Sequence, residues 1–534
     1  MPATAQLHES SNPSPMTFLD PLYSLFLVLL VVGYWHPAIG GNNESRRLAL
    51  LLLASLGFYA LLQIQYVLLL LLLVVLNFYL ARWMSQPRRS PVTGTGFHPL
   101  YGQIANEEWE ETQRLWTGRM GILLVLGVVL NVLFLLGFKY LALITDGLVQ
   151  WLALPGLAPT HDWLLAHFLI PLGISFFTFE SIAYLVDVYR GAPASDSLLE
   201  FTAYKFFFPK LISGPITRFH PFISQFREQS QPNVEQFTEG LWLFAAGAIK
   251  KALIADPLGI FVDLCFGNSA RAGSVDLWLA VLAYGLQLYF DFSGYVDMAR
   301  GSALFLGFKL PENFNFPYFT TSIASFWRRW HITLGDWLRN YLYFPLGGSR
   351  QSLGRTCFNL WFILFIAGIW HIDANKGEAW GYLVWGVLHG LALIAHRLTE
   401  AQAKQSLDRG AVWATLPGTL LAWLLTQSFV FLSWIFFRLP NLKESGWVLG
   451  HLFGARGDAQ FVQKVYGEAL GVARVDLAWL ILLVLVFMAI AYLIQRGLQL
   501  QLNWHLKLVL VPLCFLAVWL LAPEGGTQYI YFDF

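Results

Sequence analysis

The sequence carries little charge for its length. Only 13% of its 534 residues are Asp, Glu, Lys or Arg, and 56% are hydrophobic, whereas a soluble protein has about 25% charged residues. This shortage of charge excludes a soluble multidomain protein. Near-continuous apolar runs, such as residues 66–79, are also stronger signals than the alternating strands of an outer-membrane barrel give. The composition therefore predicts an all-α, polytopic bundle of membrane helices.

Neither a charge excess nor paired cysteines are present. The 34 basic and 33 acidic residues leave a net charge of +1, so the chain lacks the concentrated basic surface that nucleic acid requires. Cys265, Cys357 and Cys514 lie far apart and form no CxxC pair. This spacing argues against a disulfide framework and against a thiolate metal site. We expect the cysteines to be packing residues.

Several catalytic motifs are also missing. The sequence contains no HExxH, no Walker loop, no GxSxG elbow and no GxGxxG that follows a strand. Metal-dependent hydrolysis, nucleotide hydrolysis and serine esterase chemistry therefore have no support. No metal and no bound cofactor are predicted, and no cofactor-binding residues are assigned.

Apolar runs that approach the length of a membrane span recur along the chain. They lie near residues 21–36, 47–63, 64–82, 119–137, 164–187, 276–291, 357–371, 379–397, 411–437, 476–495 and 505–522. Shorter apolar pieces that contain Pro, Gly or charge lie near residues 138–153, 203–218, 238–262 and 294–309. We expect these pieces to be re-entrant or interfacial. With a span of about 20 residues, the pattern predicts about 11–14 spanning or re-entrant helices.

The chain is predicted to form one membrane domain, residues 21–534, after a polar tail, residues 1–20. The tail contains no Lys or Arg, and no small-residue cleavage site follows the apolar run 22–35. We therefore expect this run to be a retained first span and not a signal peptide. No repeat relates the two halves of the domain, which argues against an inverted-repeat transporter.

The segment 328–355 is strongly basic. It contains one acidic residue, Asp336, and five arginines: Arg328, Arg329, Arg339, Arg350 and Arg355. Cytoplasmic loops of membrane proteins carry an excess of Lys and Arg. We therefore expect this segment to face the cytoplasm.

Within the segment 326–350, the pattern predicts an amphipathic helix that ends at Pro345 and the pair Gly347 and Gly348. At helical spacing, one face carries Trp327, His331, Leu334, Leu338 and Tyr341. One interpretation is an interfacial helix whose tryptophans lie at the level of the lipid headgroups. That interpretation leaves His331, on the buried face, without a role.

A second interpretation of His331 pairs it with Asp336. Their spacing matches the HxxxxD motif of glycerolipid acyltransferases, in which Asp orients a histidine base. On a regular helix, five residues turn about 140°, so the two side chains diverge. The pair therefore requires a break at Gly335.

Two further histidines lie inside apolar runs. His371 closes the run 358–370, which has no charged residue, and His389 lies in WGVLHG. An ionisable group in such surroundings is costly and is a functional candidate by default. A neutral imidazole there keeps a nitrogen that can accept a proton, as a general base must. We expect base chemistry at His371 and a structural role, in a helix interface, at His389.

Other polar side chains interrupt the apolar sequence. They are Glu180, Asp187, Lys210, Asp291 and Asp297. We expect them to be charge pairs and helix caps inside the bundle, because buried charges are normally paired.

Six strings between residues 175 and 390 form a distinctive set. They are SFFTFESIAYLVDVYRG (175–191), FFPKLISGPITR (207–218), YFDFSGYVDMARG (289–301), PENFNFPYFTTSIASFWRRWHITLGDWLRNYLYFPLGG (311–348), IAGIWH (366–371) and WGVLHG (385–390). Together they resemble the membrane-bound O-acyltransferase (MBOAT) family. The likeness is to the bacterial branch of alginate O-acetyltransferase membrane components and teichoic acid D-alanyl transfer proteins, and the family-like core covers residues 171–390.

The resemblance implies a helix bundle in the bacterial inner membrane, with a central tunnel. An acyl donor, acetyl-CoA or a carrier-bound acyl group, would reach it from the cytoplasmic side. The family's essential histidine falls on His371 and its second common histidine on His331. The implied activity is transfer of an acetyl or similar short acyl group to hydroxyls of an extracytoplasmic polysaccharide, through a soluble partner acyltransferase in some related systems.

One departure from the family pattern lies directly after His371. The family usually continues WHG, whereas this chain continues with IDANKGEAW, in which Asp373, Lys376 and Glu378 would line the outer mouth. Two alternative functions are left open.

The first is transfer of D-alanyl or another acyl group to a cell-wall polymer. The second is transport, with buried histidines that relay protons.

Overall fold

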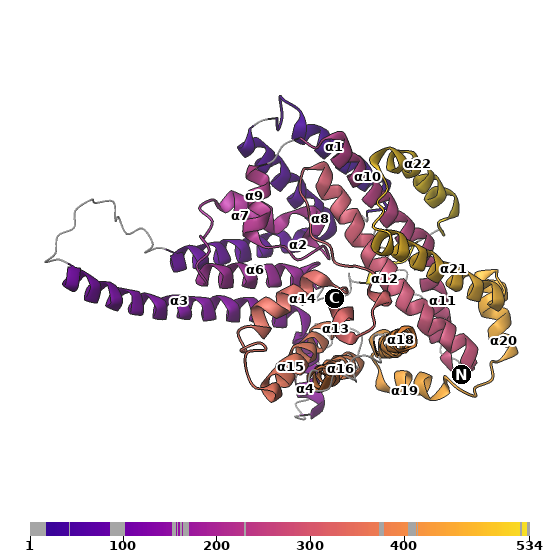
Figure 1. Cartoon of the computed structure of the whole chain (residues 1–534). Coiled ribbons are helices and arrows are strands. Elements are labelled where there is room, and N and C mark those ends of the chain that lie inside the picture. The colour runs from indigo at the N-terminus through magenta and orange to yellow at the C-terminus, as the bar shows by residue number, and fades with distance from the viewer. Residues whose placement is uncertain are drawn as a thin grey trace.

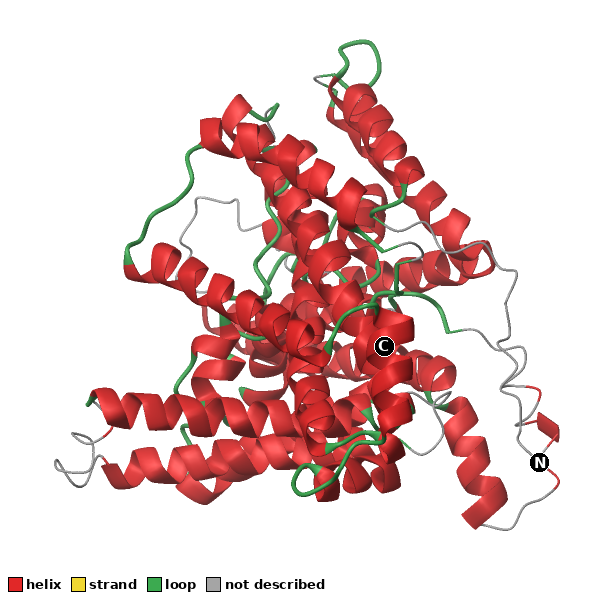
Figure 2. Cartoon of the chain, turned by 90° about the vertical axis from the view of Figure 1, so that its right-hand side faces the viewer, coloured by secondary structure: helices red, strands yellow, loops and turns green. Residues whose placement is uncertain are grey.

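The computed structural model describes residues 18–41, 43–85, 102–151, 170–228, 231–372, 379–403, 415–523 and 526–530, and positions 156, 159, 160, 163 and 413. Helices and loops make up the described residues, and no strand occurs among them (Figure 2). This confirms the predicted all-α class. Most of the predicted tail, and Asp373, Lys376 and Glu378 after His371, lie outside the described residues.

The helices follow one another along the chain (Figure 1). The first half contains α1 (Pro21–Trp35), α2 (Glu44–Ser85), α3 (Gly102–Lys139), α4 (Leu141–Trp151), α6 (Ile174–Tyr189), α7 (Leu198–Phe206), α8 (Phe208–Leu211), α9 (Phe219–Arg227), α10 (Val234–Ala248) and α11 (Asp256–Gly267). The second half contains α12 (Ser274–Phe305), α13 (Ile323–Trp327), α14 (Ile332–Leu338), α15 (Leu353–His371), α16 (Trp380–Ala403), α18 (Leu416–Arg438), α19 (Leu442–His451), α20 (Ala459–Val462), α21 (Arg474–Tyr492) and α22 (Trp504–Leu521).

Short 3₁₀ and π segments extend or connect these helices. The 3₁₀ turns are Ser269–Arg271 and Pro317–Phe319. The π segments are Ile249–Ala255, Arg339–Tyr343, Gln463–Leu470 and Leu493–Gly497.

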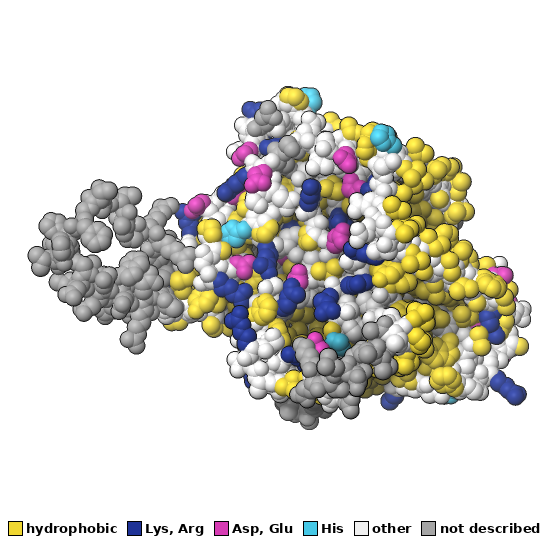
Figure 3. Space-filling view, in the orientation of Figure 1, with side chains coloured by type: hydrophobic (Ala, Val, Ile, Leu, Met, Phe, Trp, Pro, Cys, Tyr) yellow, Lys and Arg dark blue, Asp and Glu magenta, His cyan; other side chains and the backbone are white. Residues whose placement is uncertain are grey.

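Seven described helices are long and apolar enough to cross a membrane. They are α2, the Gly118–Lys139 part of α3, α12, α15, α18, α21 with its π extension, and α22. Apolar side chains cover the outer surface of α21 and α22 (Figure 3), as expected where helices face lipid. The chain is therefore a multi-pass membrane protein.

α2 corresponds to two of the predicted spans, 47–63 and 64–82. It has 42 residues, about 63 Å at 1.5 Å per residue, twice the hydrocarbon thickness of a bilayer. The backbone leaves helical geometry at Gln63, with φ −150° and ψ 73°. The Gln63 side chain donates to the carbonyl of Ile170 (3.1 Å) and accepts from the amide of Leu172 (2.7 Å). These bonds hold the kink at the predicted boundary.

α12 runs through the middle of the molecule (Figure 1) and is mostly buried. The prediction of a separate short piece at 294–309 is wrong, because α12 continues from Ser274 to Phe305 without a break. Its acidic residues are neutralised by neighbours: Lys251 lies 2.7 Å from Asp291, and Lys250 lies 2.5 Å from Asp297. Paired in this way, the two carboxylates are compatible with a continuous buried helix.

The prediction of a single helix from residue 326 to Pro345 is also wrong. α13 ends at Trp327 and α14 begins at Ile332, and His331 between them has φ +43°. This left-handed conformation is uncommon for a residue other than glycine. The Ile332 amide donates to the carbonyl of Asn313 (2.9 Å) instead of to a helical carbonyl. A tertiary partner, which periodicity does not reveal, therefore breaks the helix at His331.

Candidate active site

His371 ends α15 among aromatic rings. The residue is buried, and the ring centroids of Trp385 and Phe437 lie 5.2 and 4.9 Å from that of its imidazole. The structure thus confirms the apolar surroundings that the sequence predicts. His371 Nδ1 lies 2.7 Å from the carbonyl oxygen of Ala367. Because a carbonyl oxygen can only accept, Nδ1 carries the proton and Nε2 carries the basic lone pair.

His331 is buried at the junction between α13 and α14. Its ring lies 4.9 Å from Phe292 and 6.2 Å from Phe176, centroid to centroid. Burial lowers the pKa of His331 to about 3, so the imidazole is neutral near pH 7.

The predicted pairing of His331 with Asp336 does not occur. Asp336 has a half-exposed side chain and lies 2.7 Å from Arg339. Gly335, where the pairing needs a break, lies inside α14. The break lies at His331 itself, so the HxxxxD interpretation is wrong.

The two candidate histidines lie in one region of the bundle. The ring of Phe176 is 6.2 Å from His331 and 6.3 Å from Trp370, the residue before His371. Because Trp370 directly precedes His371, Phe176 links the surroundings of the two histidines. The structure thus brings together two residues that the sequence could only nominate separately.

A cleft with a volume of about 480 Å³ lies beside this region. Its wall includes Trp337 and Tyr341, which belong to a compact apolar cluster that also contains Trp370. Within the cluster, the ring of Phe179 lies 4.4 Å from Trp337 and 5.3 Å from Trp370. The cluster therefore connects the wall of the cleft with the residue that precedes His371.

The cleft has basic residues at its exposed edge. Arg218 and Lys309 line it and are exposed. Arg190 and Arg218 each lie 5.5 Å from the ring of Tyr341, whose hydroxyl donates to Asp187 at 2.9–3.0 Å. Lys and Arg side chains gather on this face of the molecule, over the region of α6 and α14 (Figure 3). Asp336 also lines the cleft but is paired with Arg339, so the basic side chains dominate and the cleft favours an anion.

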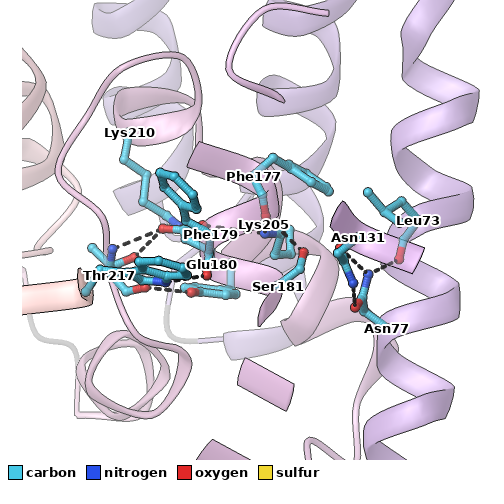
Figure 4. Close-up of polar contacts among 12 residues, drawn as sticks. Leu73, Asn77, Asn131, Phe177, Phe179, Glu180, Ser181, Lys205, Lys210 and Thr217 are labelled. Carbon is cyan, nitrogen blue, oxygen red and sulfur yellow. Dashed lines mark hydrogen bonds and ion pairs between the residues drawn. The ribbon is translucent and has the colours of Figure 1, made fainter. Parts of the chain in front are cut away.

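A buried ion cluster contacts the wall of the cleft through Thr217, and Figure 4 shows its polar contacts. Lys210 Nζ lies 2.5 and 2.6 Å from the two carboxylate oxygens of Glu180, and Lys205 Nζ lies 3.7 Å from Glu180 Oε2. Thr217, a residue of the cleft wall, donates to Glu180 Oε1 through its amide (3.1 Å) and its hydroxyl (2.9 Å). Glu180 thus ties α6, α7 and α8 to the wall of the cleft.

The structure confirms the predicted charge pairing for Glu180, Lys210, Asp291 and Asp297, whereas Asp187 accepts a hydrogen bond from the Tyr341 hydroxyl instead. Glu180 pairs with Lys210, Asp291 with Lys251, and Asp297 with Lys250. His389 likewise lies in a helix interface: its Nε2 is 2.8 Å from Ser433 Oγ, and the Ser433 hydroxyl donates to the carbonyl of Val430. Since that hydroxyl proton is used, His389 Nε2–H is the donor to Ser433.

Sequence reasoning missed three buried lysines, Lys139, Lys205 and Lys251. Lys139 ends an apolar helix, and its Nζ donates to the carbonyl of Trp370 beside His371. An ionisable residue at the end of such a run is a signal that could have identified it. Among the residues that the structure describes, no group of three His, Cys, Asp or Glu side chains could hold a metal ion.

Comparison with known proteins gives one family and several relatives. Residues 184–435 match the family model of the membrane-bound O-acyltransferases. The probable alginate O-acetylase AlgI of Pseudomonas aeruginosa is 37% identical over 432 residues, 80% of this chain and 73% of that protein. The peptidoglycan O-acetyltransferase of Helicobacter pylori is 34% identical over 471 residues, 83% of this chain and 80% of that protein.

A third relative is named as a D-alanyltransferase and not as an O-acetyltransferase. The teichoic acid D-alanyltransferase of Bacillus subtilis is 28% identical over 275 residues, which cover 48% of this chain and 66% of that protein. The similarity to the two O-acetylating proteins is thus both higher and more extensive.

Proposed function

Because this chain belongs to the membrane-bound O-acyltransferase family, we propose that it transfers an acetyl or similar short acyl group across the bacterial inner membrane to hydroxyls of an extracytoplasmic polysaccharide. The observation that carries this proposal is the geometry at His371, where Nδ1–H is bound to Ala367 and Nε2 keeps the basic lone pair. Family membership favours the enzyme over the transporter. The higher identity to O-acetylating relatives favours acetyl over D-alanyl transfer.

In the proposed reaction, His371 is the general base. Nε2 takes the proton of an acceptor hydroxyl while the hydroxyl oxygen bonds to the thioester carbonyl carbon. The carbon–sulfur bond then breaks, the ester is formed, and the proton passes to the leaving thiolate. The apolar cluster of Phe179, Trp337 and Trp370 supports this chemistry, because a site that excludes water protects the thioester from hydrolysis.

We assign the donor to the cleft beside the apolar cluster. Acetyl-CoA and a carrier-bound acyl group both carry phosphates, which would be attracted to Arg218 and Lys309. His331 lies two residues from Thr333, a residue of the cleft wall, and its neutral ring would line the path of the acyl group. The acceptor would approach from the opposite side of the membrane, in some cases through a soluble partner acyltransferase.

The side of the donor can be tested at Ser349, an exposed residue of the basic segment. In a cysteine-free background, Ser349→Cys should react with a membrane-impermeant maleimide only after the cells are opened, because the positive segment is expected in the cytoplasm. Labelling of Ser349→Cys in intact cells would place the segment outside and would reverse the donor-side assignment.

The reaction itself can be tested in inside-out membrane vesicles loaded with alginate or peptidoglycan fragments. We expect radiolabelled acetyl-CoA, supplied outside with cytosol as a source of carrier, to yield an alkali-labile ester on the enclosed polymer. Vesicles without the protein are the control. Label that crosses the membrane without forming an ester would contradict the proposal and would favour a transporter.

A further inference from the structure

The last turn of α15 is held by residues from another helix. Carbonyls in the last turn of a helix have no partner within the helix. Here the Tyr140 hydroxyl donates to the carbonyls of Ile369 (2.9 Å) and Trp370 (3.2 Å), and Lys139 Nζ donates to the Trp370 carbonyl. Lys139 is the last residue of α3 and Tyr140 follows it. These contacts join segments about 230 positions apart in the sequence.

We infer that Lys139 and Tyr140 are positioning residues for His371, an inference that rests on the proposed function. The carbonyl of Trp370 belongs to the peptide unit that joins it to His371, so a donor that fixes this carbonyl fixes the backbone from which the imidazole extends. The bond from His371 Nδ1 to Ala367 then sets the direction of the ring. Together the contacts define where Nε2 lies.

The positive charge of Lys139 also helps to hold the end of α15 that carries His371. Lys139 is 2% exposed, and its ammonium group lies at the negative end of the α15 dipole, where a cation is stabilised. Its Nζ also lies 5.2 Å from the ring of Trp370. A methionine at this position would preserve the apolar stem while removing both the charge and the hydrogen bond.

α3, which carries Lys139, is itself hydrogen-bonded to α2, and this limits its movement relative to α15. Asn131 donates to Asn77 Oδ1 (2.7 Å), and Asn77 donates in return to Asn131 Oδ1 (3.3 Å), joining α3 to α2 (Figure 4). Each amide also donates to a carbonyl of its own helix. Asn131 precedes Lys139 by two helical turns, about 12 Å. The paired amides therefore fix α3 close to the end that holds α15.

Steady-state transfer assays on the purified full chain test the inference. We expect Tyr140→Phe and Lys139→Met to lower kcat by about 10-fold to 10²-fold, the scale of a misplaced catalytic group, while KM for the acyl donor stays within about twofold because the cleft is intact. Lys139→Arg, which keeps the charge and a donor, should retain more activity than Lys139→Met.

Tyr318→Phe is the matched control, because its hydroxyl also donates to a buried helix carbonyl, that of Gly285 (2.6 Å). It should reduce thermal stability about as much as Tyr140→Phe without the loss of kcat. Wild-type kcat in both Tyr140→Phe and Lys139→Met, or an equal loss in Tyr318→Phe, would overturn the positioning role. Absence of acyl transfer by the wild-type chain would instead overturn the proposed function.

Discussion

Replacing His371 with glutamine is expected to lower polymer acylation by about 10²–10⁴-fold, the usual contribution of a general base. Glutamine keeps the approximate size of the side chain and a donor for the carbonyl of Ala367, but it cannot take a proton in the working pH range. The loss corresponds to about 2.7–5.4 kcal/mol of transition-state stabilisation. Initial rates of ester formation in the vesicle assay, normalised to the amount of folded protein, measure it.

His389→Gln is the matched control for this experiment. His389 is buried like His371, and its Nε2–H donates to Ser433 within a helix interface. Its replacement should affect packing and hydrogen bonding but not proton transfer, so the expected loss of activity is far smaller. Normal acylation by a well-expressed His371→Gln variant would contradict the catalytic assignment.

The sequence predicted features that depend on local composition. The run before His371 contains no charge, so its apolar surroundings followed directly from the residues. The same reasoning identified Glu180 and Lys210 as residues that need partners inside an apolar bundle, and the structure pairs them at 2.5 Å. Such predictions succeed because burying an unpaired charge is costly wherever it occurs.

Features that depend on long-range contacts could not be predicted. Periodicity gave a continuous helix through His331, but the backbone there is bound to Asn313 in a preceding loop. The contact of Lys139 with the carbonyl of Trp370 is likewise tertiary. No single-sequence pattern states which loop or helix will supply such a partner, so the geometry that holds both histidines required the structure.

The buried cluster around Glu180 carries the second large expected effect. Its carboxylate is the partner of two buried lysines, Lys205 and Lys210. Burial lowers the pKa of Lys205 to about 7, and the Glu180 carboxylate acts in the opposite direction. The ammonium groups therefore depend on Glu180 for their stabilisation.

Glu180→Gln is expected to lower the free energy of unfolding by about 3–5 kcal/mol, the cost of leaving a buried charge without its partner. Glu200→Gln is the control, because Glu200 pairs with Arg227, whose side chain is 62% exposed, and such surface pairs contribute only about 0–1 kcal/mol. Thermal unfolding in detergent, together with the yield of monodisperse protein, measures both variants.

A double variant separates the loss of charge pairing from a disturbance of shape. Removing both partners of a buried pair is often nearly neutral, whereas removing one is not. Glu180→Gln combined with Lys210→Met should therefore be more stable than Glu180→Gln alone, and in both variants the glutamine amide oxygen can still accept from Thr217. Lys205 keeps its hydrogen bond to the carbonyl of Phe177 (2.6 Å) in the double variant. If the second substitution lowers stability further, the effect of Glu180 is one of packing and hydrogen bonding, and the electrostatic account is wrong.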